Sequence, residues 1–109
     1  MTKIELQRLV AELCAELALH RHHAQHYRGP SGNRRDNPSV PGFPDSVIVG
    51  TAILFRELIS RDGILEPAQR RWGSRITRAG GDWAIWRPAD WHSGLIRQQL
   101  TEISPLETN

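Results

Sequence analysis

The distribution of apolar residues along the chain predicts helices in some stretches and strands in others. Over residues 3–18, apolar side chains recur every three or four positions, which is the spacing of one face of an amphipathic helix. Two short apolar runs, residues 45–49 (DSVIV) and 52–59 (AILFRELI), are separated by Gly50-Thr51 and predict a β-hairpin. The predicted helix face consists of Ile4, Leu6, Leu9, Val10, Leu13, Cys14 and Leu17.

The remaining segments extend this series of elements. Residues 17–24 (LALHRHHA) lose the helical period and predict a short strand. Proline suits the first turn of a helix and glycine suits its end. The later elements are a helix from Pro67 to Gly80-Gly81, a strand in residues 82–88 (DWAIWRP), and a helix from Pro88 to about Ile103. The predicted order is α-β-β-β-α-β-α.

One long segment between the elements predicts a loop. Residues 28–44 (RGPSGNRRDNPSVPGFP) are crowded with Gly, Pro, Ser and Asn, which are turn-forming residues. Loops of this length are uncommon in small domains and are usually functional or mobile, so we expect a mobile loop. The chain is expected to form a single domain over residues 1–104, with a loose tail at 105–109.

Composition narrows the classes of protein that fit. The 109 residues are 39% hydrophobic and 24% charged, which is ordinary for a soluble globular domain. No apolar run reaches the length of a membrane span, and the first residues lack the apolar stretch of a signal peptide, so no membrane partner is expected. The single cysteine, Cys14, excludes an internal disulfide. It lies on the predicted helix face and fits a core position in a reducing, cytoplasmic environment.

The basic residues are almost all of one type. Of 14 Lys and Arg residues only Lys3 is lysine, which leaves 13 arginines, and the formal net charge is +2. Arginine suits phosphate because its planar group donates two hydrogen bonds at once. Genome base composition accounts for the excess equally well. The charge therefore favours a nucleic-acid partner without establishing one.

Two acidic residues carry the candidate chemistry. Asp45 begins one strand of the predicted hairpin, and Glu57 lies in the other. If the register brings them together, their carboxylates would repel unless a cation joined them, and Mg²⁺ prefers such oxygen ligands. A metal held there would polarise a phosphodiester and activate water. On spacing alone, ordinary strand and turn acids are the commoner interpretation.

Four short motifs resemble the VRR-NUC family, a branch of the PD-(D/E)XK nuclease superfamily. That family has a Gly-x-Pro-Asp turn, a Glu-x-Lys strand, a helix with a glutamine and a downstream tryptophan, and a strand that often ends in Trp-Arg-Pro. The matching segments here, spread over residues 4–91 together with the opening IELQRLV, are GFPD (42–45), RELI (56–59), PAQRRW (67–72) and WRP (86–88).

The resemblance implies a fold and a function. The fold would be α/β and restriction-endonuclease-like, with a small mixed β-sheet flanked by helices. The protein would cleave DNA, branched DNA included, with Mg²⁺ or Mn²⁺. It would be phage-encoded, act in the cytoplasm of an infected bacterium and form a homodimer. The implied metal ligands are Asp45, Glu57, the carbonyl of Leu58 and Glu5, and Gln69 would orient a water or a phosphate oxygen.

The chain departs from the family where the strand lysine is expected. That lysine helps to position the attacking water and offsets charge on the phosphate, but the position is occupied by Ile59. The loss of such an electrostatic contact costs about 10²–10³ in rate. Arg61 follows on the same predicted strand face and is the candidate substitute, whereas Arg56 points to the opposite face. Lys3, the only lysine, sits at the start of the first helix.

Several exposed cations are candidate DNA contacts. They are Arg28, Arg34 and Arg35 in the loop, Arg61, Arg71 and Arg75 further along, and His22. Plain solvation is the alternative for each arginine. The histidines of HRHHAQH invite a zinc interpretation, but no Cys pair or His-Glu motif supplies further ligands, so we favour partly exposed strand histidines that touch DNA. The four tryptophans favour packing over base stacking.

Three functions remain open. The first is a metal-dependent DNA endonuclease. The second is an inactive nuclease fold that binds DNA or a host protein. An active enzyme should show Arg61 or another cation near the metal, whereas an inactive one should show a dry, apolar contact at Ile59. The third is an unrelated interaction domain, which would require Asp45 and Glu57 to point apart.

Overall fold

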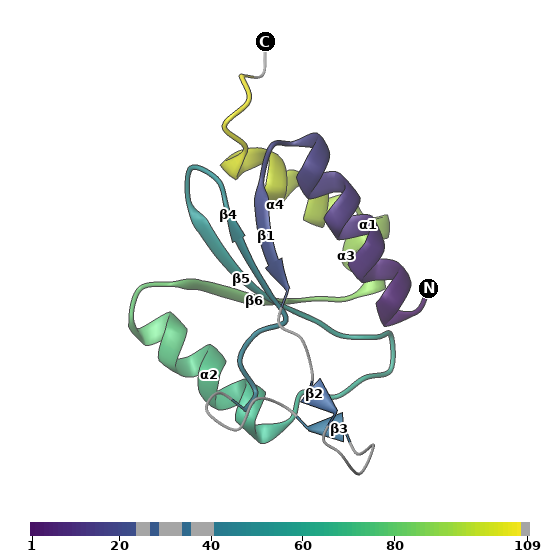
Figure 1. Cartoon of the computed structure of the whole chain (residues 1–109), viewed down its shortest axis with the longest axis vertical. Helices are drawn as coiled ribbons and strands as arrows, with labels where there is room; N and C mark the ends of the chain where they lie inside the picture. The colour runs from purple at the N-terminus through teal and green to yellow at the C-terminus, as the bar shows by residue number, and fades with distance from the viewer. Residues whose placement is uncertain (24–26, 29–33, 36–40, 108–109) are drawn as a thin grey trace.

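The computed structural model describes residues 1–23, 27–28, 34–35 and 41–107. Figure 1 shows a sheet with helices packed around it. The helices are α1 (Lys3–Glu16), α2 (Pro67–Arg78), α3 (Pro88–His92) and α4 (Leu95–Ile103). The strands are β1 (His20–His23), β2 (Tyr27–Arg28), β3 (Arg34–Arg35), β4 (Ser46–Val49), β5 (Ile53–Leu58) and β6 (Asp82–Trp86). The fold is α/β with a mixed sheet, and the predicted order of the main elements is confirmed.

The main sheet has four strands in the order β1-β4-β5-β6. β1 and β4 are antiparallel, β4 and β5 form the predicted hairpin, and β6 lies parallel to β5. The hairpin turn is longer than the predicted Gly50-Thr51 pair, because Val49 is opposite Ile53 and Gly50 N–H donates to the Ala52 carbonyl at 2.9 Å. This additional residue sets the register of the hairpin.

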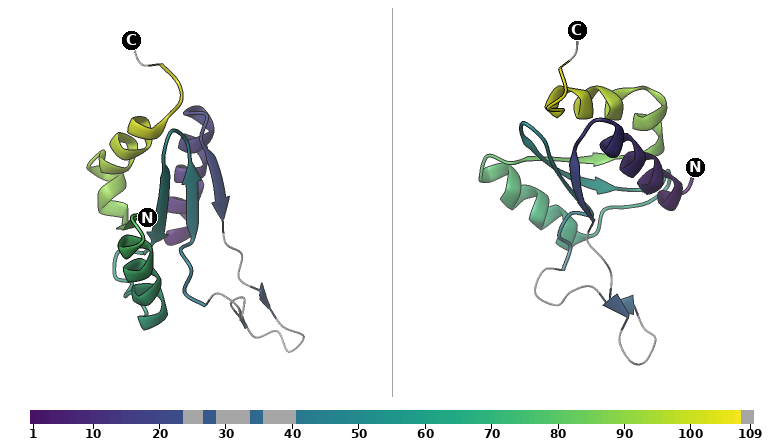
Figure 2. Two further views of the ribbon diagram at one scale, coloured as in Figure 1. Left: turned by 90° about the vertical axis from the view of Figure 1, so that its left-hand side faces the viewer. Right: turned by 45° about the horizontal axis from the view of Figure 1, so that its top comes forward.

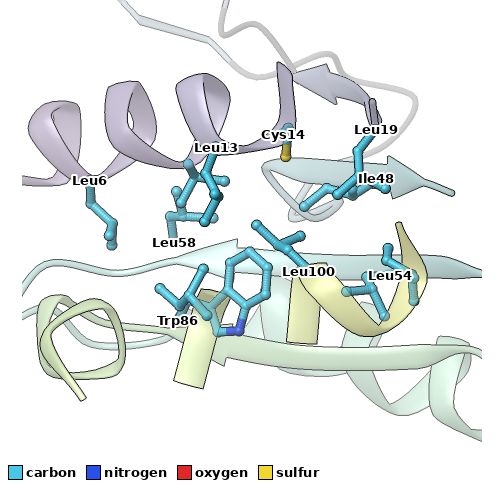
Figure 3. Close-up of a cluster of buried hydrophobic side chains, with 12 residues drawn as sticks. Leu6, Leu13, Cys14, Leu19, Ile48, Leu54, Leu58, Trp86 and Leu100 are labelled. Carbon is cyan, nitrogen blue, oxygen red and sulfur yellow. The ribbon is translucent and has the colours of Figure 1, made fainter. Parts of the chain in front are cut away.

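Helices cover both faces of the sheet. α1, α3 and α4 contact one another and bury the apolar core against one face. In Figure 3, Leu6 and Leu13 of α1 point toward Leu58 of β5, with Trp86 of β6 and Leu100 of α4 in the same cluster. α2 lies against the opposite face, where Gly73 allows Trp83 of β6 to approach the helix backbone.

Local sequence fixes the ends of these helices. Thr2 caps α1 by accepting a hydrogen bond from the Glu5 backbone N–H at 3.1 Å, and prolines begin α2 and α3. The predicted last helix, from Pro88 to Ile103, is divided in two. Gly94 adopts φ +86°, a left-handed conformation that ends α3 and turns the chain into α4.

Part of the predicted loop over residues 28–44 forms strands. β2 and β3 pair antiparallel, with Tyr27 opposite Arg35 and Arg28 opposite Arg34. Figures 1 and 2 show this small hairpin projecting from the body of the protein, beyond one end of the main sheet. Residues 29–33 and 36–40 lie outside the described part of the chain, and so does the end of the predicted tail, 108–109. Among the described helices, none is both long and apolar enough to cross a membrane.

Candidate active site

The hairpin register places the two predicted acids opposite each other. Ser46 pairs with Arg56 across β4 and β5, so the next position outward sets Asp45 against Glu57. Directly opposed residues of an antiparallel pair point to the same face. Both residues are almost fully buried, with 3% exposure for Asp45 and 1% for Glu57. The two carboxyl groups therefore meet, which argues against the unrelated interaction domain.

Two donors hold the Asp45 carboxylate. The backbone N–H of Leu58 donates to Oδ2 at 3.2 Å, and Nζ of Lys3 lies 2.9 Å from the same oxygen. Lys3 comes from the first turn of α1, so the helix and the hairpin are joined at this point. The predicted contribution of the Leu58 carbonyl to a metal site stays a prediction.

Glu57 is in an environment that disfavours its charge. Burial raises the pKa of Glu57 to about 8, and the charge of Asp45 and a hydrogen bond between the two carboxyl groups act in the same direction. Lys3 and a hydrogen bond from Gln69 act to lower this pKa. Oε2 of Glu57 is buried and has no hydrogen-bond partner in the described structure.

Gln69 lies where the resemblance placed it, on the first turn of α2. Its Oε1 accepts a hydrogen bond from the Glu66 backbone N–H at 2.8 Å, which caps the helix. Its side chain also acts on Glu57. One amide therefore anchors the helix N-terminus to the acid pair.

Glu5 does not join this pair. It is exposed, and its Oε1 accepts from the Thr2 hydroxyl at 3.2 Å. The physical reason is the helical period. Lys3 precedes Leu6 and Val10 on the buried stripe of α1, whereas Glu5 lies to one side. The described residues contain no group of three or more His, Cys, Asp or Glu able to hold a metal, so the predicted ligand role of Glu5 is not supported.

The two arginines considered near the strand have other partners. Arg61 lies beyond the end of β5, is highly exposed and pairs loosely with Asp62 at 3.9 Å. Arg56 points to the opposite face, as predicted, and pairs with Asp82 at 3.0 Å. Ile59 itself is 6% exposed. The apolar contact expected of an inactive fold is therefore present, together with the nearby cation expected of an active one, which is Lys3.

A second cation near Asp45 was missed from the sequence. Arg21 of β1 is half-buried, donates from Nε to the Ser46 hydroxyl at 3.1 Å and lies 3.2 Å from Nδ1 of His23. Burial lowers the pKa of Arg21, while Cys14 and Asp45 act to raise it. The one sequence signal for Arg21 is the alternation along HRHH (residues 20–23). It places Arg21 and His23 on the half-buried face of the strand and His22 on the exposed face.

The predicted DNA contacts lie on several elements. Arg71 and Arg75 of α2 and His22 of β1 are exposed, and the guanidinium of Arg75 lies over Trp72 at 5.5 Å. Arg61 lines a pocket of about 400 Å³ together with Met1, Arg87, Pro88, Ala89 and His92. Of Arg28, Arg34 and Arg35 only the strands they form are described, and His26 of the histidine-rich segment lies outside the described residues.

The core predictions are confirmed for Trp86, Trp91 and Cys14. Trp86 is fully buried and Trp91 packs against the core cluster. Cys14 is 1% exposed, and burial raises the pKa of its thiol to about 11, so it is not poised as a nucleophile.

No family model, curated protein or solved structure matches the chain. The geometry of the site therefore has to be judged on its own chemistry.

The acid pair fits a small, hard divalent cation. Magnesium is usually held by one or two carboxylates together with waters and substrate phosphates, so a third acid is not required. Burial, and after it the charge of Asp45, raises the pKa of Glu57, and Oε2 of Glu57 has no hydrogen-bond partner in the described structure. A divalent cation bound by both acids would stabilise their charged forms and use this oxygen. On these grounds Asp45 and Glu57 fit Mg²⁺ or Mn²⁺.

Proposed function

We propose that the protein is a divalent-metal-dependent DNA endonuclease that hydrolyses phosphodiester bonds, with Asp45 and Glu57 as its metal-binding core. The observation that carries the proposal is the pairing of two buried carboxyl groups across β4 and β5. Burial and the neighbouring carboxylate raise the pKa of Glu57, and acids perturbed in this way cluster at functional sites. The family resemblance points to the same two residues.

The proposed chemistry divides between the cation and the chain. When bound, Mg²⁺ or Mn²⁺ supplies Lewis-acid polarisation of a phosphate oxygen and lowers the pKa of water. Asp45 and Glu57 would hold it, with the Leu58 carbonyl as a further ligand. Gln69 keeps Glu57 oriented from the N-terminus of α2, and the burial of both acids excludes bulk water from their inner side.

Arginines on several elements offer a path for a DNA strand. Arg71 and Arg75 on α2, Arg61 beyond β5, and the β2–β3 hairpin with Arg28, Arg34 and Arg35 would contact phosphates, and His22 would contribute from β1. Such contacts position the strand without reading its sequence. We expect binding to weaken steeply with salt. A homodimer would present two such sites to branched DNA.

The test is cleavage of supercoiled plasmid and of a branched DNA with Mg²⁺, with Mn²⁺ and with EDTA. We expect cutting by the wild type with either metal, and loss of at least about 10²-fold in rate for Asp45→Ala and for Glu57→Ala. Glu12→Gln is the matched control, because Glu12 is an exposed acid that pairs with Arg8 within α1. Cutting that persists in both alanine variants would remove the acid pair from the mechanism.

One observation favours a second function. Ile59 is buried where the family has its lysine. This apolar contact suits an inactive nuclease fold that binds DNA or a host protein. In that case no DNA is cut under any condition, while a fluorescent branched DNA still binds in EDTA and the binding weakens in Arg71→Ala/Arg75→Ala.

A further inference from the structure

Lys3 is the only lysine of the chain, and its position in the structure is unusual for a lysine. Its Nζ lies 2.9 Å from Oδ2 of Asp45, with the Asp45 side chain only 4% exposed and that of Lys3 34% exposed. Lys3 also lowers the pKa of Glu57, so its charge acts on both acids. A surface lysine would gain little from such a contact, whereas this one reaches into the acid pair.

The fold holds Lys3 at this place through α1. Lys3 precedes Leu6, Val10 and Leu13 on one stripe of the helix, and these three leucine and valine side chains are buried in the core. Thr2 caps the same turn. The core packing of α1 therefore fixes the position from which the Lys3 side chain reaches Asp45.

The other described cations near this end of the sheet have partners of their own. Arg61 is exposed beside Asp62, and Nη1 of Arg87 donates to the carbonyls of Ser60 and Gly63 at 2.8 and 2.9 Å. Arg21 donates to Ser46. Lysine, in contrast, is a compact point charge on a flexible stem and can move from one oxygen to another.

We infer that Lys3 is a catalytic residue that supplies, from α1, the positive charge missing at Ile59, and that it contacts the scissile phosphate of the DNA. The inference rests on the proposed nuclease function. In hydrolysis, the oxygen of water forms a bond to phosphorus and gives its proton to solvent. The ester P–O bond breaks, and its electron pair leaves with the ester oxygen, which takes a proton from solvent. Lys3 stabilises the charge that grows on the non-bridging oxygens.

The experiment replaces Lys3 by methionine, which keeps the length and the apolar stem. We expect Lys3→Met to lower the rate of plasmid cleavage about 10²-fold. We expect Mn²⁺ to bind about tenfold more tightly, measured calorimetrically without DNA, because the competing ammonium is gone from Asp45. The two opposite changes distinguish a catalytic cation from a structural one, whose loss would weaken both. Arg8→Met, an exposed cation on the same helix, is the matched control and should change neither.

A second variant returns a lysine to the strand. Lys3→Met/Ile59→Lys should recover at least about tenfold of the lost rate, since the charge is restored beside the same acids. Thermal unfolding of each variant shows that it is folded. Cleavage unchanged in Lys3→Met would overturn the inference and leave the proposed function standing. Cleavage that appears only in Lys3→Met would also overturn it and identify Lys3 as an inhibitory substitute for the metal. No cleavage by the wild type or by any of the variants would overturn both.

Discussion

Arg56 and Glu57 are neighbours in β5, both almost fully buried, and yet their surroundings are opposite. Their exposed fractions are 2% and 1%. Because successive strand residues point to opposite faces, Arg56 faces α4 and Glu57 faces α2. A buried charge is normally tolerated only when it is paired and hydrogen-bonded. The two residues therefore pose the same physical problem on the two sides of one strand.

Arg56 is both paired with an opposite charge and hydrogen-bonded. Its Nη1 lies 3.0 Å from the Asp82 carboxylate and donates to the Asp82 carbonyl at 2.7 Å, and Nη2 donates to Gln99 at 3.1 Å. The guanidinium lies 5.1 Å from the centroid of the Trp86 ring. Nε alone has no partner in the described structure. Burial lowers the pKa of Arg56, and Asp82 acts to raise it.

The Glu57 side does not meet this requirement. The charge that acts most strongly on Glu57 is another carboxylate, and Asp45 adds to the effect of burial on the pKa more than Lys3 and Gln69 oppose it. Arg56 is therefore a structural charge, held inside the fold by its partners. Glu57 instead makes physical sense as a ligand for a cation that arrives later.

The largest expected effect comes from removing the buried side chain of Arg56. Arg56→Ala removes the pair with Asp82 and the contact with Trp86, and it leaves a cavity between β5 and α4. We expect it to lower the free energy of unfolding by about 3 kcal/mol. Urea unfolding followed by tryptophan fluorescence measures this. A loss below about 1 kcal/mol would show that Arg56 is not the structural charge described above.

Neutralising Glu57, the neighbour of Arg56 in β5, is expected to raise the free energy of unfolding rather than to lower it. The folded pKa of Glu57, about 8, lies above the ordinary value of 4.5, so the folded protein binds more protons than the unfolded chain between these values. The contribution of Glu57 to stability is therefore fully present below pH 4.5 and is lost as the pH rises through 8. Glu57→Gln escapes this loss, and we expect it to be more stable than the wild type by on the order of 2 kcal/mol at pH 8.

The measurement is urea unfolding in EDTA at a series of pH values, with both proteins under identical conditions. The difference between them should shrink toward zero near pH 4.5. Groups that do not interact with Glu57 titrate equally in both proteins and cancel in the difference. A difference that does not depend on pH would contradict the raised pKa and, with it, the contrast between the two faces.

A divalent cation should stabilise the protein only through the face of β5 that carries Glu57. Binding to the folded protein at ten times the dissociation constant adds about 1.4 kcal/mol of stability. We expect Mn²⁺ to raise the melting temperature of the wild type and of Arg56→Met, which keeps the acid pair, but not that of Glu57→Gln. Scanning calorimetry with and without EDTA measures this. An equal response in all three proteins would place the cation elsewhere.

The elements were predictable from the sequence, but the meeting of the two acids was not. A two-residue turn at Gly50-Thr51 would have set Asp45 opposite Arg56, whereas the longer turn sets it opposite Glu57. A change of one residue in the register reverses the face of every side chain, and it depends on turn geometry that the apolar pattern does not contain. The apolar pattern did not show whether Asp45 and Glu57 meet, and only the family resemblance indicated these two residues as a pair.

Lys3 was not predicted as part of the site, although a weak signal was present. It stands one turn before Leu6 on the apolar stripe of α1, so the only lysine shares the face of the core. The pattern gave no means to tell which strand end this face would meet, because that depends on how α1 crosses the sheet. Glu5, the expected ligand, lies beside this stripe and is exposed, so its role as a ligand stays a prediction.

The smallest expected effect concerns Asp82, the partner of Arg56. Its side chain is 62% exposed, so water solvates this carboxylate and screens the pair. We expect Asp82→Asn to lower the free energy of unfolding by less than about 1 kcal/mol, and the loss to shrink further in high salt. The reason is that the Asp82 carbonyl and Gln99 still accept hydrogen bonds from Arg56. Urea unfolding at low and high NaCl measures both. A loss as large as that of Arg56→Ala would mean that the buried arginine depends on this one charge rather than on its hydrogen bonds.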